Sequence, residues 1–294
     1  MYYIKSNIIG FFTFILIVIE LIIGFGTLTI VNIPRAIFPL KSLKIKLSKI
    51  SNTIGEYTVY GLKIIMKIMH RDSMQIFDDN EFSKNQWYMA VSNHQSWADI
   101  FILLVAAHKR IPLLKFFMKK ELQWIPIIYL VHKTIDMPFL NRHSQKQIEA
   151  NPELKKLDYQ NAETAAKRFS RNPSTAFSFA EGTRFTHEKH LAQASPYKNF
   201  LTPKIGALAI ALKGMPQVNE LIDFTVIYST NKRSTWDFLC GEMSQAKVYA
   251  KAHEIPKTLK GKNFDQEEEY RREFKNFIEK IWEEKQEIYT ELEF

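Results

Sequence analysis

The distribution of apolar and polar residues divides the 294-residue chain into four stretches. Residues 8–33 are almost wholly apolar, and residues 43–71 place apolar side chains at helical spacing on one face. Residues 72–85 are polar and predict a linker, whereas residues 86–294 alternate short β-rich runs with helical ones. The pattern therefore predicts an N-terminal helical region followed by an α/β domain.

The apolar stretch of residues 8–33 is long enough to cross a hydrocarbon core of about 30 Å as a helix. A charged Glu20 near its centre would be costly in lipid, so this side chain should be protonated, paired or turned toward protein. A membrane span over about residues 8–33 is the preferred interpretation, with a re-entrant or interfacial hairpin and a buried core helix as the alternatives. A cleaved signal peptide fits less well, because no small-residue cleavage pattern follows the long apolar stretch.

The segment of residues 43–71 predicts a basic amphipathic helix that lies on the bilayer, with a helix packed on the domain surface as the alternative. Residues 1–71 contain nine Lys or Arg and two acidic residues, in a chain whose net charge is +9. Because positive charge gathers beside the apolar stretch, an anionic membrane is a better partner than nucleic acid. Most of the basic residues follow the stretch, which predicts an N-terminal anchor with the bulk of the protein at the cytoplasmic face of the inner membrane.

The α/β region has recognisable strand and helix candidates. Cys240 is the chain's one cysteine, which excludes an internal disulfide and fits a reducing compartment. Short β-rich runs predict strands at 87–91, 174–179 and 224–228. Helical runs predict helices at 100–107, 161–171 and 206–213, and helical spacing predicts a C-terminal amphipathic helix at 265–292.

The stretch AVSNHQSWADI, Ala90 to Ile100, leaves a predicted strand and enters a predicted helix. Reactive groups collect where the strands of an α/β sheet end. Asp99 is placed to fix the tautomer of His94, so that the other ring nitrogen accepts a proton. No Gly-x-Ser-x-Gly elbow occurs in the chain, so the base would act on a hydroxyl of the substrate. The alternative is a structural corner in which Asp99 caps a helix and His94 packs.

A second polar corner, AEGTRF, follows the predicted strand at 174–179. Glu181 supplies a carboxylate, Gly182 permits close backbone approach, and Arg184 supplies a guanidinium suited to phosphate. By itself the sequence from Glu181 to Arg184 is also typical of a charged turn. The nearby HEKH, His187 to His190, lacks the spacing of a zinc-binding His-Glu-x-x-His helix and predicts a solvated loop.

Together, NHQSWAD and FAEGTR resemble the Asn-His-x4-Asp and Phe-Pro-Glu-Gly-Thr-Arg blocks of the glycerophospholipid acyltransferase family, whose members include 1-acylglycerol-3-phosphate acyltransferases. Two weaker blocks match in order: FLNR, which ends at Arg142, and LTPKIGALA, which contains Lys204. The resemblance covers roughly residues 85–235. It implies a mixed central sheet flanked by helices.

The resemblance also implies a reaction, the transfer of a fatty acyl group from an acyl thioester to the free hydroxyl of a lysophospholipid. The thioester would be acyl-CoA or an acylated acyl carrier protein, and no metal or other cofactor is required. By similarity, His94 would be the general base and Asp99 its orienting partner. The acceptor would be bound by Glu181, Gly182, Thr183 and Arg184, with Arg142 and Lys204 at its phosphate.

Three departures from the family pattern leave the acceptor head group open. Ala180 replaces a proline, Asn141 stands where many members have Asp, and DFTVIYS, Asp223 to Ser229, replaces a Val-Pro-x-x-Pro-Val block. These features are more similar to the branch of lysophosphatidylglycerol and lysocardiolipin acyltransferases and to some bacterial inner-membrane relatives. Two other functions remain: a non-catalytic lipid-binding membrane protein that retains the fold, and an acyltransferase for a non-phospholipid acceptor.

Overall fold

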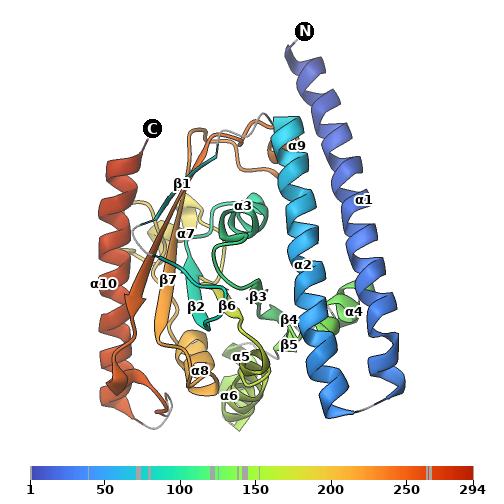
Figure 1. Ribbon diagram of the computed structural model, residues 1–294. Helices are drawn as coiled ribbons and strands as arrows, with labels where there is room; N and C mark the ends of the chain where they lie inside the picture. Colours follow the sequence, from blue (N-terminus) through green and yellow to red (C-terminus); the bar gives the residue numbers. More distant parts are fainter. Residues whose placement is uncertain are drawn as a thin grey trace.

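The chain folds into a long helical hairpin and a layered α/β domain (Figure 1). The computed structural model describes residues 2–38, 40–70, 74–78, 81–119, 123–124, 126–137, 139–140, 145–151, 153–262, 264 and 267–293. The arrangement confirms the predicted fold class, a central mixed sheet flanked by helices and preceded by an apolar helix.

The hairpin consists of α1 (Tyr2–Ile37) and α2 (Lys41–His70), which lie side by side in Figure 1. Gly61 of α2 brings the two helices close together, because a Cβ atom there would collide with the carboxyl group of Glu20. Glu20 therefore faces α2, one of the three outcomes expected for a polar residue in this apolar stretch. Both predicted helices of the N-terminal region are confirmed as helices.

The main sheet has the strand order β1-β8-β7-β2-β6-β3 among the described residues, and every neighbouring pair is parallel except β7 and β8. The predicted strands β2, β6 and β7 form its centre. The predicted linker at 72–85 is corrected, because it contains edge strand β1, which is too short to show a clear alternation. The strands are β1 (Gln75–Asp78), β2 (Tyr88–Ser92), β3 (Leu114–Phe116), β6 (Thr175–Phe179), β7 (Glu220–Tyr228) and β8 (Ala246–Glu254).

Helices cover both faces of the sheet. On one face α3 (Ala98–Ala107) packs with α2 over the alternate β7 side chains Ile222, Phe224 and Val226. On the other face Leu221 and Ile227 pack with α8 and α10. Strand alternation thus gives β7 two apolar faces, as expected for a central strand. The covering helices include α6 (Glu153–Ala166), α8 (Gly206–Gly214) and α10 (Glu268–Leu292), and the last confirms the predicted C-terminal amphipathic helix.

The remaining elements are short and lie around the sheet. Residues 187–190, predicted as a solvated loop, belong to helix α7, because the Thr186 hydroxyl caps it by accepting a hydrogen bond from the Lys189 N–H. The helix predicted at 161–171 starts earlier and ends at Ala166, before a 3-10 turn. These elements are α4 (Pro126–Thr134), α5 (Gln145–Ala150), α7 (His187–Ala192), α9 (Thr235–Leu239), the strand pair β4 (Met118–Lys119) and β5 (Phe139–Leu140), and the 3-10 turns Phe169–Arg171 and Lys257–Leu259.

Both ends of α1 contact the α/β domain. Near the N-terminus, the Trp236 indole N–H donates to Asn7 Oδ1 over 2.9 Å. Near the other end, Arg35 forms an ion pair with Asp136 at 2.7 Å. The Ser48 hydroxyl of α2 donates to the second oxygen of the Asp136 carboxylate. The hairpin is therefore attached to the domain along its length.

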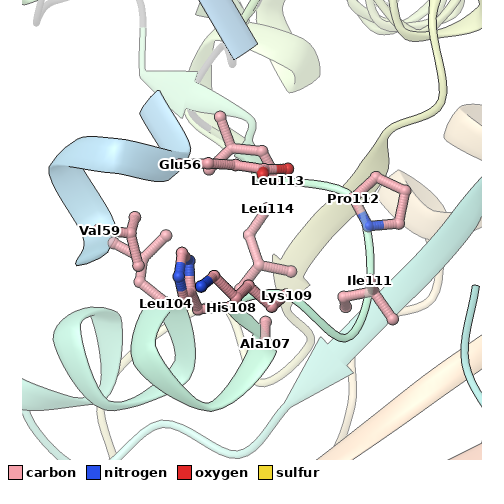
Figure 2. Close-up of a pocket in the computed structure, with 10 residues that line it drawn as sticks. All are labelled: Glu56, Val59, Leu104, Ala107, His108, Lys109, Ile111, Pro112, Leu113 and Leu114. Atoms are coloured by element: carbon pink, nitrogen blue, oxygen red, sulfur yellow. The ribbon is translucent and has the colours of Figure 1, made fainter. Parts of the chain in front are cut away.

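A small cavity lies where α2 meets α3 and the segment leading to β3 (Figure 2). Its volume of about 10 Å³ gives room for about one water molecule. The His108 ring at its edge stacks on Tyr60 with centroids 5.8 Å apart, and burial lowers the pKa of this histidine. The cavity is thus part of the packing between hairpin and domain, because it is too small for a substrate.

Candidate active site

The two polar corners identified in the sequence lie side by side at the carboxyl ends of two inner strands of the sheet. Strands β2 and β6 are parallel neighbours, and Ser92 at the end of β2 is in register with Phe179 at the end of β6. The loops that follow are joined by a hydrogen bond of 2.7 Å from the Phe185 N–H to the His94 carbonyl oxygen. The His94 ring stacks on Phe179 with centroids 3.8 Å apart. Corners about 85 residues apart in the sequence therefore share one surface.

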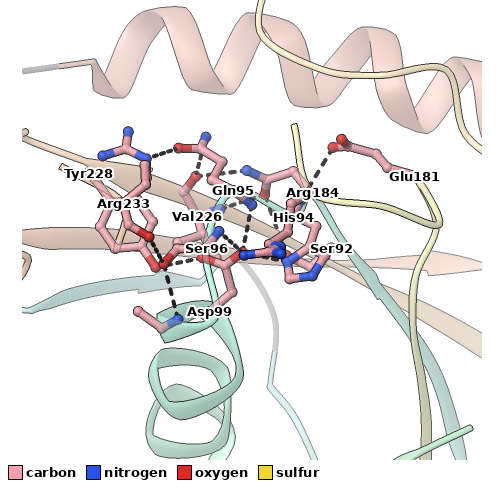
Figure 3. A network of polar contacts seen from close by, with 12 residues as sticks. Ser92, His94, Gln95, Ser96, Asp99, Glu181, Arg184, Val226, Tyr228 and Arg233 are labelled. Carbon is pink, nitrogen blue, oxygen red and sulfur yellow. Dashed lines mark hydrogen bonds and ion pairs between the residues drawn. The ribbon is translucent and has the colours of Figure 1, made fainter. Parts of the chain in front are cut away.

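His94 and Asp99 form a hydrogen-bonded pair at the start of α3 (Figure 3). The distance from His94 Nδ1 to Asp99 Oδ2 is 2.8 Å. The same oxygen accepts hydrogen bonds from the backbone N–H groups of Gln95, at 2.6 Å, and Ser96, at 2.9 Å. The Tyr228 hydroxyl donates to Asp99 Oδ1 over 2.6 Å. With Nδ1–H bound to the carboxylate, Nε2 of the neutral ring is the proton acceptor.

The two side chains of this pair differ in exposure. The Asp99 side chain is fully buried, whereas 15% of the His94 side chain is exposed. The pair therefore presents its imidazole, and not its carboxylate, toward a substrate.

Asn93 fixes the end of β2 to β7. Its side-chain amide donates to the Val226 carbonyl oxygen and accepts from the Val226 N–H, both at 2.9 Å. Asn93 is fully buried, so these two hydrogen bonds satisfy polar atoms that have lost water. Sequence reasoning assigned Asn93 no role, although it precedes His94 in the first block. Its contacts make it a positioning residue for the corner.

Glu181 is fully buried and faces the protein interior. Its Oε1 accepts a hydrogen bond of 3.3 Å from the His94 backbone N–H. Burial raises the pKa of this carboxyl to about 8, although the backbone N–H groups of Leu201 and His94 and the charge of Lys285 act in the opposite direction. Glu181 thus braces the His94 corner, and its contact with the acceptor stays a prediction.

Arg184 lies beside the first corner. Its guanidinium sits over the Trp97 ring, 5.6 Å from the ring centroid, and Trp97 is 55% exposed. A guanidinium on the face of an indole keeps its charge and has N–H groups left for an anion. Arg142, also predicted at the phosphate, lies outside the described residues.

Two further predicted residues, Lys204 and Thr183, lie at the AEGTRF turn. Gly182 has φ +70°, and a Cβ atom there would lie 2.9 Å from Lys204 Cδ, so glycine allows both the turn and the approach of the lysine. The Lys204 N–H donates to the Ala180 carbonyl oxygen over 2.7 Å. The Thr183 hydroxyl accepts from Lys189 Nζ over 2.8 Å. Lys204 and Arg184 therefore bring two cations to the turn that touches His94.

A buried ion pair beneath the site was missed by sequence reasoning. Lys285 of α10 is fully buried and pairs with Asp223 of β7 at 2.7 Å. Lys285 Nζ also donates to the Phe224 carbonyl oxygen over 2.7 Å and to the Thr225 hydroxyl over 3.3 Å. The available signal was a lysine on the apolar stripe that includes Ile281 in the 265–292 helix. In the described part of the chain, no three His, Cys, Asp or Glu side chains gather closely enough to hold a metal ion.

The mixed α/β sheet thus carries a His-Asp pair at the end of a central strand, with cations on the neighbouring turn. The family model described as Acyltransferase matches residues 74–229, more than half of the chain, and the protein belongs to this family. The fold is similar to the crystal structure of the 1-acyl-sn-glycerophosphate (LPA) acyltransferase PlsC from Thermotoga maritima. The TM-score is 0.56, the sequence identity 18%, and the match covers 97% of each chain. No curated protein matches the chain.

Proposed function

We propose that this acyltransferase transfers a fatty acyl group from an acyl thioester to the free hydroxyl of a lysophospholipid. The observation that carries the proposal is the contact between the two corners, which places the His94–Asp99 pair beside the turn that holds Arg184 and Lys204. A base for a hydroxyl and cations for a phosphate are the two groups that such an acceptor requires. The fold shared with an LPA acyltransferase supports the same reaction class.

His94 acts as the general base in this proposal. Its Nε2 removes the proton of the acceptor hydroxyl as the oxygen attacks the thioester carbonyl carbon. Asp99 holds Nδ1–H and stabilises the imidazolium that forms. When the tetrahedral intermediate collapses, the C–S bond breaks and the imidazolium gives its proton to the thiolate. The products are the acylated lipid and a free thiol, so neither a metal nor a covalent acyl-enzyme is needed.

The cationic turn binds the acceptor phosphate. Arg184 offers a planar fork of N–H donors and Lys204 a point charge, which suits a phosphate ester better than a neutral head group. Arg142 is the third phosphate ligand that the family resemblance implies. Coenzyme A and acyl carrier protein remain the two donor candidates, because both present the acyl group as a thioester.

The hairpin holds the enzyme at the membrane. Among the described residues, α1 is the helix long and apolar enough to span a bilayer, but both of its ends contact the α/β domain. A crossing helix would separate these ends by a hydrocarbon core of about 30 Å. The contacts favour the interfacial-hairpin interpretation, with the apolar face in one leaflet. Large exposed side chains on this face include Ile8, Phe11, Phe12, Ile19, Ile23, Ile30 and Ile33.

The basic residues around the connection of the two helices favour an anionic leaflet, and we place the enzyme at the cytoplasmic face of the inner membrane. Arg35, Lys41, Lys44, Lys46 and Lys49 gather within this part of the chain. Flotation with neutral and anionic vesicles tests this placement. Binding to anionic vesicles that salt weakens but does not abolish is expected, since apolar insertion remains.

The experiment for the reaction is a panel of lysophospholipids incubated with the purified protein in lipid vesicles and with labelled acyl-CoA or acyl carrier protein. Mass spectrometry identifies the acylated product. His94→Ala should lower kcat by about 10²–10⁴-fold, the usual contribution of a positioned base. Arg184→Ala should instead raise the KM for the lysolipid, so its defect should shrink at high acceptor concentration.

The other functions predict different products. Acylation of a phosphate-free acceptor, with no product from the lysophospholipids, would favour the non-phospholipid alternative. Vesicle binding without acyl transfer from either thioester would favour the non-catalytic lipid-binding alternative. A His94→Ala variant as fast as the parent would show that the base is assigned to the wrong residue.

A further inference from the structure

Tyr228 contributes a hydrogen bond to the catalytic pair from a strand outside both sequence blocks. It is the last residue of β7, and its hydroxyl donates to Asp99 Oδ1 over 2.6 Å (Figure 3). The other Asp99 oxygen is occupied by His94 and two backbone N–H groups. Tyr228 therefore engages the carboxylate oxygen that faces away from the imidazole.

The phenol is suited to donate a proton to this hydrogen bond but not to lose it. Tyr228 is buried, and burial together with the Asp99 charge raises the pKa of its hydroxyl well above the usual value. A neutral hydrogen-bond donor stabilises a buried carboxylate and leaves its negative charge in place. The negative charge of Asp99 thus remains available to His94 as the imidazole gains a proton.

Neighbouring contacts hold the phenol in place. The Arg233 guanidinium lies over the Tyr228 ring, 4.7 Å from its centroid, and Arg233 Nε donates to the Gln95 side-chain oxygen over 3.1 Å. The Ser96 hydroxyl donates to the Arg233 carbonyl oxygen over 2.7 Å. The loop after β7 is thereby tied to the same two residues whose backbone N–H groups hold Asp99.

The position of Tyr228 depends on the block that departs from the family pattern. In DFTVIYS, Tyr228 points to the α3 face of the sheet, while Asp223 points to the opposite face and meets Lys285. The odd separation of the two residues along a strand places them on opposite faces. The four residues that the Val-Pro-x-x-Pro-Val block specifies carry no hydroxyl.

We infer that Tyr228 is a positioning residue for acyl transfer, which fixes the Asp99 carboxylate so that the carboxylate orients His94. The inference rests on the proposed function for its kinetic part. Its consequence for the environment of the His94 ring can be measured without a substrate.

The first test is Tyr228→Phe, which removes the hydroxyl and keeps the ring. Loss of a hydrogen bond to a buried carboxylate should lower kcat by about 10–100-fold, while the KM for the lysolipid stays near that of the parent. Tyr270→Phe is the matched control, since the Tyr270 hydroxyl is also buried but donates to the Leu259 carbonyl oxygen at the far side of the domain. Tyr270→Phe should leave kcat unchanged.

The pH profile separates positioning from a merely structural role. Among the described residues, the other titratable or charged groups beside the pair are Glu181 and Arg184 on the loop after β6, Lys204 against that loop, and Arg233 on the loop after β7. Without the phenol, more of the Asp99 charge acts on the ring, which favours the imidazolium. The acid limb of the kcat/KM profile should therefore move to higher pH in Tyr228→Phe and stay in place in Tyr270→Phe.

A double-mutant cycle tests whether Tyr228 acts through Asp99. Tyr228→Phe combined with Asp99→Asn should be hardly slower than Asp99→Asn alone, because the carboxylate on which the phenol acts is already gone. Multiplying effects would overturn the inference. Equal loss of kcat in both tyrosine variants with unmoved pH limbs would also overturn it.

The substrate-independent test uses histidine-labelled protein and NMR, with the His94 ring signals identified by their loss in His94→Gln. These signals should shift in Tyr228→Phe, while the ring signals of His190 should not. If the parent acylates no lysolipid, the proposed function fails while the shift still tests Tyr228. If the parent is active and the His94 signals do not move, the role of Tyr228 is refuted and the proposed function stands.

Discussion

Two regions of the molecule each contain a buried aspartate, and the two aspartates have different kinds of partner. Asp99 lies in the first turn of α3, beyond the carboxyl end of the inner strand β2, and Asp136 lies where the hairpin meets the domain. Each accepts hydrogen bonds from segments distant in the sequence: Tyr228 reaches Asp99, and Arg35 and Ser48 reach Asp136. Burial and multiple donors are therefore common to both regions and do not by themselves mark a catalytic carboxylate.

The difference lies in the donors. Asp136 is paired with Arg35 at 2.7 Å and Arg171 at 3.1 Å, two guanidinium groups that carry permanent charge. Asp99 is held by neutral N–H and O–H groups and by His94, whose charge can change. The two arginine side chains neutralise Asp136 and link two parts of the fold. In the proposed mechanism, Asp99 instead stabilises the His94 imidazolium. The chemistry of a buried acid thus follows from its partners.

The largest effect is expected from exchanging the carboxylate for an amide in each region. Asp99→Asn should lower kcat by about 10²–10⁴-fold, because an amide can hold the wrong tautomer of His94. Asp136→Asn should leave kcat close to that of the parent, because it lies outside the corner. Acyl-transfer kinetics of the two variants measure this difference, and equal losses of kcat would contradict the comparison.

Asp136→Asn should instead affect the stability of the protein. Asp136→Asn should lower the free energy of unfolding by about 1–3 kcal/mol, a modest loss because the two arginine side chains, 14% and 41% exposed, can regain water. Denaturant unfolding of the protein in detergent measures it. A shift no larger than that caused by Lys275→Ala, on the exposed face of α10, would mean that the ion pairs contribute little to holding the hairpin.

Glu181 sharpens the comparison as a third buried carboxyl, and its effect depends on pH. Its pKa is raised from 4.5 to about 8, so between these values the folded protein holds a proton that the unfolded chain releases. Stability should therefore fall as pH rises through this window, with a slope of at most about 1.4 kcal/mol per pH unit from this group. Glu181→Gln should remove that part of the slope. Unfolding free energies at several pH values measure it, and identical slopes in parent and variant would refute the assignment.

The smallest effect compares two glycines with similar backbone conformations. Gly182 at φ +70° and Gly261 at φ +72° should each lose about 1–2 kcal/mol of stability on change to alanine. A Cβ atom at Gly182 would press on Lys204, whereas one at Gly261 meets nothing within 4 Å. Only Gly182→Ala should therefore also raise the KM for the lysolipid. Equal KM values in the two variants would separate Lys204 from acceptor binding.

Much of the fold was predictable because its central parts have strong local patterns. Short runs rich in β-branched and aromatic residues predict β2, β6 and β7, and helical spacing predicts α2 and α10. Edge strand β1 was read as part of a linker, because four residues with polar ends carry little signal. The sequence pattern does not predict helix α7, because HEKH is polar all round and the Thr186 cap is its one helix signal.

The candidate site was predictable where its residues stand close together in the sequence. His94 and Asp99 are five residues apart across one turn, and Glu181 to Arg184 are consecutive. Asn93, Tyr228 and Lys285 were missed as functional residues, because each acts on a partner brought near by sheet pairing or helix packing. No local spacing predicts such contacts.

The sequence by itself determined the apolar helix, the α/β alternation and the identity of the two polar corners, since these depend on residue type and short-range periodicity. The tertiary structure decided what the corners do together. Parallel pairing of β2 with β6 brings His94 beside the AEGTRF turn, burial turns Glu181 inward, and β7 delivers Tyr228 to Asp99. The contacts at both ends of α1, on which the proposed interfacial hairpin rests, likewise depend on tertiary packing. The reason is physical: hydrogen bonds, burial and charge depend on distances in space, and the distances between remote residues are set only when the chain packs.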